Sequence, residues 1–351
     1  MTSIRCNLLA CAAAAAGLVL GQGAATPAAA QMVDGPKFEW KMSAYGSPRP
    51  TTTVANRFVE ILSERTGGNL KVDIAYGEVL SPAREIMDGL KIGAFEMGFA
   101  TASYYPGKLP AHTVFDLPFL PFADMTVETK VMLGFFRLPE AEAEMARWNA
   151  RNITPLTLAP FQMIGKGTPP RVVNDLRNKR IRAGGGMAEA LRRIGVAVVQ
   201  MPSPELYGAI ERGVVDGIVT SHDVTHAFKL YEVANWYATN LDMGVQQAAI
   251  AIALDKWNAL PPQYKQLIDE AGVKAADAQV ERLKTANLAA IDEFRKRGMT
   301  AVTFDTADRD AFVKANAAPV WDAWVEEMDK KGIPGRKLLD FVLTEAKKAS
   351  M

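Results

Sequence analysis

The sequence predicts a two-lobed α/β protein with a cleft between the lobes. Strand-like and helix-like patterns alternate from Phe38 onward, which is typical of parallel sheets covered by helices. The same alternation restarts after a helical stretch at 127–149. The chain has 351 residues, and the roughly 320 that follow an N-terminal export segment are enough for two domains or two lobes that share crossovers.

The N-terminus predicts export across a membrane. Arg5 precedes an apolar run at 8–20, and the small residues Ala28-Ala29-Ala30 come just before Gln31. This order is that of a signal peptide, and the run is shorter than the about 20 residues of a membrane-spanning helix. We expect a signal peptide at 1–30 that is cleaved after Ala30. The alternative is lipoprotein processing at Cys11, although the apolar run continues past that residue.

The composition describes a plain globular protein after export. Both cysteines, Cys6 and Cys11, lie in the predicted signal peptide, so the mature chain has no disulfide, thiol nucleophile or thiolate metal site. Loss of Arg5 takes the formal net charge from +1 to about zero. Since nucleic acids and anionic membranes are bound by basic faces, we expect neither as a partner.

The first strand–helix series starts with a strand at 38–45, which ends before Gly46-Ser47-Pro48. Leu70, Val72 and Ile74 alternate with polar residues and predict a second strand. Ser81-Pro82 is expected to open a helix, because proline favours the first helical position. The predicted strands are 38–45, 69–76 and 96–102, and the clearest helix is 51–65.

The second series repeats this pattern and leads into long helices. The predicted strands are 153–161, 180–183, 196–201 and 217–220, with helices at 187–194 and 204–213 and a long helix at 263–297. Residues 302–305 are expected to pair back into a sheet, and Thr306 is expected to cap a helix with Asp308 in its first turn.

These patterns give an order of segments. Residues 31–155 are expected to form mainly lobe 1, and 156–245 mainly lobe 2. Residues 246–351 are expected to supply a crossover strand, the long connecting helix and C-terminal helices that pack on both lobes.

Arg182 is the leading candidate for ligand binding. It ends a short predicted strand and is followed by three glycines, 184–186, and a helix. Backbone N–H groups at a glycine-rich helix start attract anions, and a guanidinium can bind a carboxylate through two parallel hydrogen bonds. Ligands of parallel sheets bind at the carboxyl ends of the strands. A solvated surface charge is the alternative interpretation of Arg182.

Two other patterns leave alternatives open. His222 and His226 lie four residues apart, similar to a zinc protease signature, although Asp223 stands where a glutamate is usual and no third ligand is visible. A secreted hydrolase that binds zinc through His222 and His226 is therefore the alternative function. Tyr104 and Tyr105 follow a predicted strand end and either line a pocket or pack in the lobe.

Several stretches together resemble the substrate-binding subunit of tripartite ATP-independent periplasmic (TRAP) transporters, the family that includes the C4-dicarboxylate receptors. They match in order and spacing over nearly the whole mature chain and lie at 77–80, 84–94, 116–120, 175–182, 205–210 and 213–217. The resemblance implies a two-lobed periplasmic-binding-protein-like α/β fold with a ligand cleft and a long hinge-spanning helix. It also implies a periplasmic receptor that closes on its ligand and delivers it to a membrane permease driven by an ion gradient.

The resemblance also assigns roles to single positions. Arg182 corresponds to the arginine that clamps the substrate carboxylate, and Thr220 stands where an asparagine often assists it. Sialic-acid receptors carry a further arginine where this chain has Phe161-Gln162, and an aromatic ring where it has Ser203. These departures indicate a monocarboxylate, aromatic or 2-hydroxy/2-oxo, rather than a sugar acid. The expected ligand-binding residues are Tyr45, Tyr104, Tyr105, Phe161, Gln162, Arg182, Gly184, Ser203, Thr220 and Ser221.

The expected partners are a small organic acid and the permease subunits of a TRAP transporter. We expect a monomer without catalytic residues, cofactor or metal site. Turnover that a chelator abolishes would favour the hydrolase, whereas a fluorescence change with acids and no turnover would favour the receptor.

Overall fold

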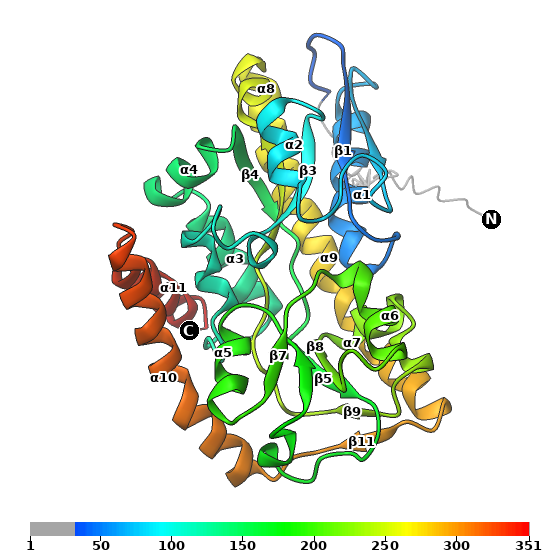
Figure 1. The fold of residues 1–351 in the computed structure, drawn as a ribbon. Coiled ribbons are helices and arrows are strands. Elements are labelled where there is room, and N and C mark those ends of the chain that lie inside the picture. The colour runs from blue at the N-terminus through cyan, green and yellow to red at the C-terminus, as the bar shows by residue number, and fades with distance from the viewer. Residues whose placement is uncertain (1–31, 351) are drawn as a thin grey trace, which may run out of the picture. The chain divides into compact units, whose positions relative to one another are not determined.

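The structure, a computed structural model, describes residues 32–350, and the strands in this range form two sheets that each define one lobe. This confirms the predicted two-lobed α/β architecture (Figure 1). The expected signal peptide at 1–30, its cleavage after Ala30 and the alternative processing at Cys11 lie outside the described residues.

Lobe 1 is built on the sheet with strand order β2-β1-β3-β10-β4. Strand β1 pairs in parallel with β2 and β3, whereas β10 pairs antiparallel to β3 and β4. The small and β-branched residues of β10 are buried along its whole length, as expected for a central strand. The strands are β1 (Phe38–Ser43), β2 (Leu70–Ala75), β3 (Met97–Thr101), β4 (Ala150–Pro155) and β10 (Ala248–Ala253).

Lobe 2 is built on the sheet with strand order β11-β9-β5-β8-β6-β7. Strand β6 lies between β7 and β8 and is parallel to both, while β5 is antiparallel to β8 and β9. The strands are β5 (Gln162–Gly165), β6 (Arg180–Arg182), β7 (Ala197–Val199), β8 (Gly217–Thr220), β9 (Trp236–Ala238) and β11 (Thr300–Val302).

Helices cover the sheets and connect the lobes. The α-helices are α1 (Thr53–Arg65), α2 (Ile86–Ile92), α3 (Met125–Phe135), α4 (Pro139–Ala146), α5 (Gly185–Arg193), α6 (Leu206–Glu211), α7 (His222–Ala227), α8 (Leu254–Ala259), α9 (Pro262–Lys296), α10 (Thr306–Lys330) and α11 (Gly335–Ala349). Short 3-10 turns that matter for the site are η1 (Pro50–Thr52), η2 (Ala102–Tyr104), η3 (Ala111–Asp116) and η5 (Ser203–Glu205).

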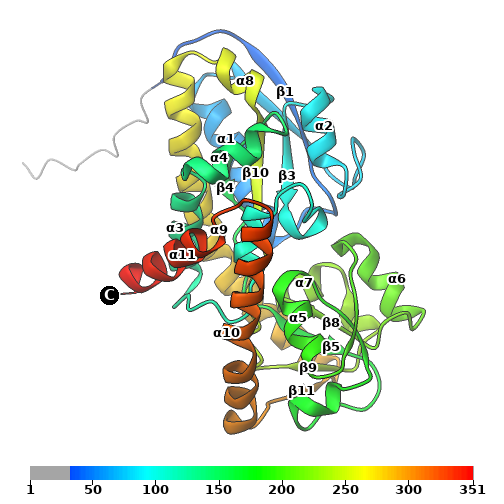
Figure 2. The same ribbon diagram turned by 60° about the vertical axis from the view of Figure 1, so that its left-hand side comes forward.

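Helix α9 joins the two lobes. It has 35 residues, which is about 50 Å at 1.5 Å per residue, and it packs against α1 in lobe 1 and α7 in lobe 2 (Figure 1). The chain also passes between the sheets from β4 to β5 and from β9 to β10. Helix α10 lies beside α5 of lobe 2 and also packs on α11, which contacts α3 (Figure 2).

Two local expectations differ from the structure. Residues 153–161 do not form one strand, because β4 ends at Pro155 and the chain then crosses to β5 in the other lobe. Proline has no N–H to continue a ladder. The expected helix at Ser81-Pro82 begins only at Ile86. The Glu78 carboxylate accepts a hydrogen bond from Ala83 N at 2.7 Å, and this holds a turn ahead of the helix.

The cap of α10 is the residue before the one expected. Asp305, not Thr306, is the N-cap, since its carboxylate accepts hydrogen bonds from the backbone N of Ala307 at 2.9 Å and of Asp308 at 3.3 Å. Both residue types cap helices well, so the sequence pattern did not distinguish the two positions.

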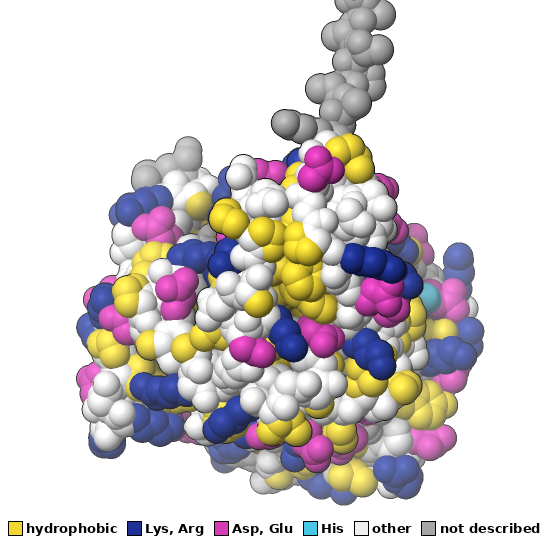
Figure 3. All heavy atoms as spheres, turned by 90° about the horizontal axis from the view of Figure 1, so that it is seen from above, with side chains coloured by type: hydrophobic (Ala, Val, Ile, Leu, Met, Phe, Trp, Pro, Cys, Tyr) yellow, Lys and Arg dark blue, Asp and Glu magenta, His cyan; other side chains and the backbone are white. Residues whose placement is uncertain are grey.

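The surface carries charges of both signs. On the face drawn in Figure 3, Lys and Arg side chains are interspersed with Asp and Glu and with separate hydrophobic groups. Among the described residues, the helices are each too short or too polar to cross a membrane.

Candidate functional site

Arg182 is a buried arginine at the carboxyl end of β6. Its side chain is held by backbone carbonyls: Nε and Nη2 donate to Met201 O at 3.1 and 2.9 Å, and Nη1 donates to Val219 O at 3.1 Å. These acceptors lie after β7 and in β8, the neighbours of β6 in the sheet. The position of β6 between two parallel strands therefore fixes the direction of the guanidinium.

The charge of Arg182 has no counterion within ion-pair distance in the range 32–350. The residue is 2% exposed, and burial lowers the pKa of its guanidinium, while Tyr104 and Tyr45 act in the opposite direction. A buried cation without an anion is costly. It is therefore suited to receive an anionic ligand group.

A cavity of about 200 Å³ opens beside this guanidinium. Its walls come from both lobes, because Ser103 and Tyr104 follow β3 in lobe 1 whereas Gly184 and Met201 follow β6 and β7 in lobe 2. The cavity is lined by Arg84, Ser103, Tyr104, Pro106, Arg182, Ala183, Gly184, Gln200, Met201 and Gln246. It therefore lies at the carboxyl ends of parallel strands, where ligands of such sheets bind.

Tyr104 is the aromatic lining residue of this cavity, and Tyr45 packs against its ring. The Tyr104 hydroxyl is 2.9 Å from Ser203 Oγ and accepts a hydrogen bond from Ser203 N at 3.1 Å. The rings of Tyr104 and Tyr45 are 5.4 Å apart, and the Tyr45 hydroxyl lies 2.7 Å from Thr101 Oγ1. Ser203 belongs to lobe 2 and Tyr104 to lobe 1, so this contact joins the two lobes beside Arg182.

The glycines after Arg182 allow close packing against other segments. A Cβ on Gly184 would lie 2.6 Å from Gln246 Nε2, and one on Gly185 would lie 2.3 Å from Asp116 Cβ. Gly185 also has a φ of +53°, which other residues rarely adopt. The glycine run is thus needed to bring the start of α5 close to η3 and to the segment before β10.

Thr220 and Ser221 lie at the carboxyl end of β8, next to β6. Both are buried, and the Ser221 hydroxyl has no hydrogen-bond partner in the described part of the chain. The expected polar positions of lobe 2 are thereby brought to the strand ends that also carry Arg182.

Of the expected ligand residues, Tyr104, Arg182 and Gly184 line the cavity. Three of the others make contacts elsewhere. The Gln162 carboxamide donates to the Asp242 carboxylate and accepts from Leu241 N at 2.8 Å. Phe161 packs in the hydrophobic core. The Tyr105 hydroxyl accepts from Thr101 N at 2.7 Å within lobe 1. The side chains of Phe161 and Gln162 therefore stabilise the start of β5, and that of Tyr105 stabilises lobe 1.

The structure adds cavity residues that the sequence did not indicate. Gln246 Nε2 donates to Ser103 Oγ at 2.6 Å, and Arg84 Nη2 donates to Gln200 O at 3.3 Å, from lobe 1 to lobe 2. Gln246 lies in an irregular segment before β10, where no periodic pattern marks it. Arg84 lies in one of the stretches that carry the family resemblance, which was the available signal.

The two histidines do not support the hydrolase alternative. His222 packs edge-on against Tyr237 and Phe294, and burial lowers its pKa to about 4. His226 stacks on Tyr231. Between residues 32 and 350 there is no group of three or more His, Cys, Asp or Glu side chains placed to hold a metal ion.

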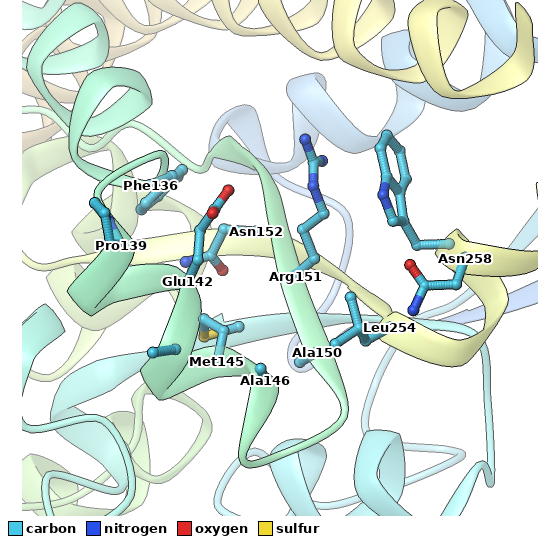
Figure 4. A pocket seen from close by; sticks show the side chains of 12 residues that line it. Phe136, Pro139, Glu142, Met145, Ala146, Ala150, Arg151, Asn152, Leu254 and Asn258 are labelled. Atoms are coloured by element: carbon cyan, nitrogen blue, oxygen red, sulfur yellow. The ribbon is translucent and has the colours of Figure 1, made fainter. Parts of the chain in front are cut away.

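A larger cavity of about 490 Å³ lies within lobe 1. Figure 4 shows that Glu142 and Met145 come to it from α4, Arg151 and Asn152 from β4, and Asn258 from α8. Arg151 is its one cationic lining residue in the described range. Its guanidinium already binds Asp269 Oδ1 at 3.0 Å and Oδ2 at 3.2 Å, so it offers no unpaired charge to a carboxylate.

Residues 43–328 match the family described as bacterial extracellular solute-binding protein, family 7. The chain belongs to this family. The match covers both lobes and Arg182, and it confirms the resemblance to TRAP solute receptors. Members of the family are the substrate-binding proteins of transporters rather than enzymes, and they act in the periplasm.

Two relatives and one solved structure illustrate the similarity of this family 7 protein. A monocarboxylate 2-oxoacid-binding periplasmic protein of Nostoc sp. is 25% identical and is matched over 82% of this chain and 84% of its own. The C4-dicarboxylate-binding protein DctP of Rhodobacter capsulatus is 24% identical over 81% and 85%. A TRAP solute-binding protein of Rhodoferax ferrireducens, solved with copurified benzoate, has a TM-score of 0.81 at 20% identity, covering 90% and 99%.

Proposed function

We propose that this protein is an extracytoplasmic receptor that captures a small monocarboxylate, aromatic or 2-hydroxy/2-oxo, and delivers it to a TRAP-type permease. The observation that carries the proposal is the buried Arg182 guanidinium, which faces an interlobe cavity and has no carboxylate partner in the described chain. A ligand carboxylate supplies the missing anion and forms two charge-assisted hydrogen bonds.

The size and lining of the cavity support a small ligand. At about 200 Å³ it is smaller than the usual 300–1,000 Å³ of drug-sized sites. Tyr104 provides an apolar face that also carries a hydroxyl, and Ser103 and Gln246 provide hydrogen-bonding groups for a hydroxyl or keto oxygen. The relatives that bind 2-oxoacids and benzoate are consistent with this chemistry.

The contacts between the lobes support closure around the ligand. Tyr104 with Ser203 and Arg84 with Gln200 O connect the lobes at the cavity. A bound acid would then be enclosed by both lobes, and release would require these contacts to open.

A thermal-shift screen against organic acids, followed by calorimetric titration, tests the proposal. A ligand at 100 times its Kd stabilises a protein by about 2.7 kcal/mol. We expect shifts with small monocarboxylates, no turnover of the ligand, and no effect of a chelator. Binding only of compounds without a carboxylate would contradict the proposal.

A further inference from the structure

Asp223 is a buried acid that the proposed carboxylate clamp does not use. It lies in the first turn of α7, is 1% exposed, and neither of its carboxylate oxygens has a hydrogen-bond partner in the described chain. Burial raises its pKa, while the positive charge of the Arg49 guanidinium acts in the opposite direction. An acid that is buried without partners is costly, so a role in binding accounts for it better than a role in folding.

Arg49 approaches Asp223 from the other lobe. It follows β1 in lobe 1, and its guanidinium lies 5.5 Å from the ring centre of Phe228, just after α7 in lobe 2. Its Nη1 donates to Tyr45 O and Ser47 O, both at 3.0 Å, and no ion pair of 4.0 Å or less joins it to an acid among residues 32–350. The two opposite charges are thus near each other but not in contact.

Further unpartnered polar groups lie on the same two segments. The hydroxyls of Ser221, before α7, and Thr51, in η1, are buried without hydrogen-bond partners in the described range. Turn η1 packs directly on α7. The junction of these segments therefore has more hydrogen-bonding groups than the protein itself satisfies.

Tyr45 connects this junction to the carboxylate clamp. Its ring lies 5.2 Å from the Arg49 guanidinium on one side and 5.4 Å from the Tyr104 ring on the other. Tyr104 and Tyr45 in turn are close enough to Arg182 to raise the pKa of its guanidinium. Tyr45 and Tyr104 therefore form a chain of contacts between the Arg49–Asp223 junction and the cavity at Arg182.

We infer that Asp223 and Arg49 form the second pole of the ligand site, which accepts a neutral hydroxyl of the ligand and rejects a second carboxylate. The inference rests on the proposed function and adds a selection rule to it. A hydroxyl can donate to Asp223 while it accepts from Arg49. A carboxylate cannot donate, and at hydrogen-bond range it meets the charge of Asp223 in a site that excludes water.

The experiment compares matched ligands that differ by one carboxylate. After the library screen, wild-type protein and Asp223→Asn are titrated with 4-hydroxybutyrate against succinate and with 3-hydroxybenzoate against isophthalate. Asparagine keeps the size and removes the charge. We expect wild type to bind one monocarboxylate at least tenfold more tightly than its dicarboxylate partner. Asp223→Asn should improve dicarboxylate affinity at least tenfold and change monocarboxylate affinity less than threefold.

Two further variants separate a local contact from a general field effect. Glu205→Gln removes an exposed negative charge that also acts on Arg182, and it should leave the ratio of affinities unchanged. The double variant Arg49→Gln with Asp223→Asn should lose the gain in dicarboxylate affinity. If Asp223→Asn does not melt cooperatively, Asp223→Ser is titrated in its place.

The outcomes distinguish the inference from the proposed function. If wild type binds no monocarboxylate of the library, the proposed function fails. If wild type binds a monocarboxylate but accepts the matched dicarboxylate equally well, only the inference is overturned. The inference is also overturned if Asp223→Asn leaves the ratio of monocarboxylate to dicarboxylate affinity unchanged. It is likewise overturned if Glu205→Gln changes this ratio as much as Asp223→Asn does.

Discussion

Arg182 and Arg151 are buried or nearly buried arginines that each line a cavity, and they differ in what balances their charge. Arg151 forms a two-point ion pair with Asp269, and its guanidinium lies 3.8 Å from the ring centre of Trp257. Arg182 makes its hydrogen bonds to the carbonyls of Met201 and Val219. Carbonyls orient a guanidinium without neutralising it.

The difference separates the structural Arg151 from the proposed binding residue Arg182 more clearly than cavity size does. The cavity at Arg151 has more than twice the volume of the one at Arg182, about 490 against about 200 Å³. Yet the charge in the larger cavity is already satisfied. For a receptor of anions, the useful property is a fixed cation whose partner the protein itself does not provide.

The largest expected effect is on ligand affinity when Arg182 is removed. Loss of one partner of a buried charge pair costs about 2–5 kcal/mol, so Arg182→Ala should weaken binding of the screened acid by roughly 30-fold or more. Calorimetric titration at one pH and salt concentration measures this. If Arg182→Ala binds the acid with wild-type affinity, Arg182 is not the ligand-binding arginine and its contrast with Arg151 loses its main support.

His222 is a buried base that differs from both arginines, because burial keeps it neutral. Its pKa of about 4 lies below the usual value of about 6.5, so the unfolded chain binds more protons between these values. The free energy of unfolding should therefore fall by about 3 kcal/mol as the pH drops from 6.5 to 4. His222→Phe should lack this part of the slope. Denaturant unfolding of both proteins across this pH range measures the difference, and parallel curves would contradict it.

Arg151→Ala should affect stability and leave ligand affinity unchanged. The variant loses a two-point pair with a half-exposed acid and the contact with Trp257, which together contribute about 2 kcal/mol. Chemical denaturation and calorimetric titration of the same preparation test both parts. A loss of ligand affinity without a loss of stability would reverse the roles of the two arginines.

The smallest effect is expected at Arg180, two residues from Arg182 on the same strand. Its side chain is half exposed and pairs with Asp216, with Nη2 and Oδ1 2.7 Å apart. Since exposed pairs contribute about 0–1 kcal/mol, Arg180→Ala should change both stability and affinity only slightly. If Arg180→Ala weakened binding as much as Arg182→Ala does, the position of an arginine along β6 would not decide whether it binds the ligand.

Long periodic segments were predictable from the sequence, whereas the assignment of Arg182 as the carboxylate clamp stays a prediction. Residues 263–297 were expected as one helix, and α9 spans Pro262–Lys296, because its helical spacing of apolar residues is uninterrupted. Arg182 stood out because it ends a strand before three glycines and because it corresponds to the arginine of the family motif. The short strand β5 was missed, since the apolar residues before it form one continuous run that hides the passage from one lobe to the other.

Side chains that meet only in the folded protein were not predictable. Gln246 lies in a segment without a marked period, and the burial and missing partners of Asp223 are visible only in the folded chain. Gln162 was expected at the ligand because sialic-acid receptors carry a further arginine at this place. In the structure its carboxamide forms hydrogen bonds with the Asp242 segment. The sequence pattern predicts where a strand ends. The direction of a side chain there depends on the hydrogen-bonding groups that surround it in the folded protein.

The place of β10 has a consequence for the order in which the protein can be assembled. This strand pairs with both β3 and β4, yet it follows the strands β5 to β9 of lobe 2 in the chain. Until β10 has been synthesised as far as Ala253, β3 and β4 each present an unpaired edge. The sheet of lobe 1 then lacks the strand that joins β4 to β3. A chain of this design stays incomplete in its first lobe until most of its length has emerged, so neither lobe can finish folding as an N-terminal unit.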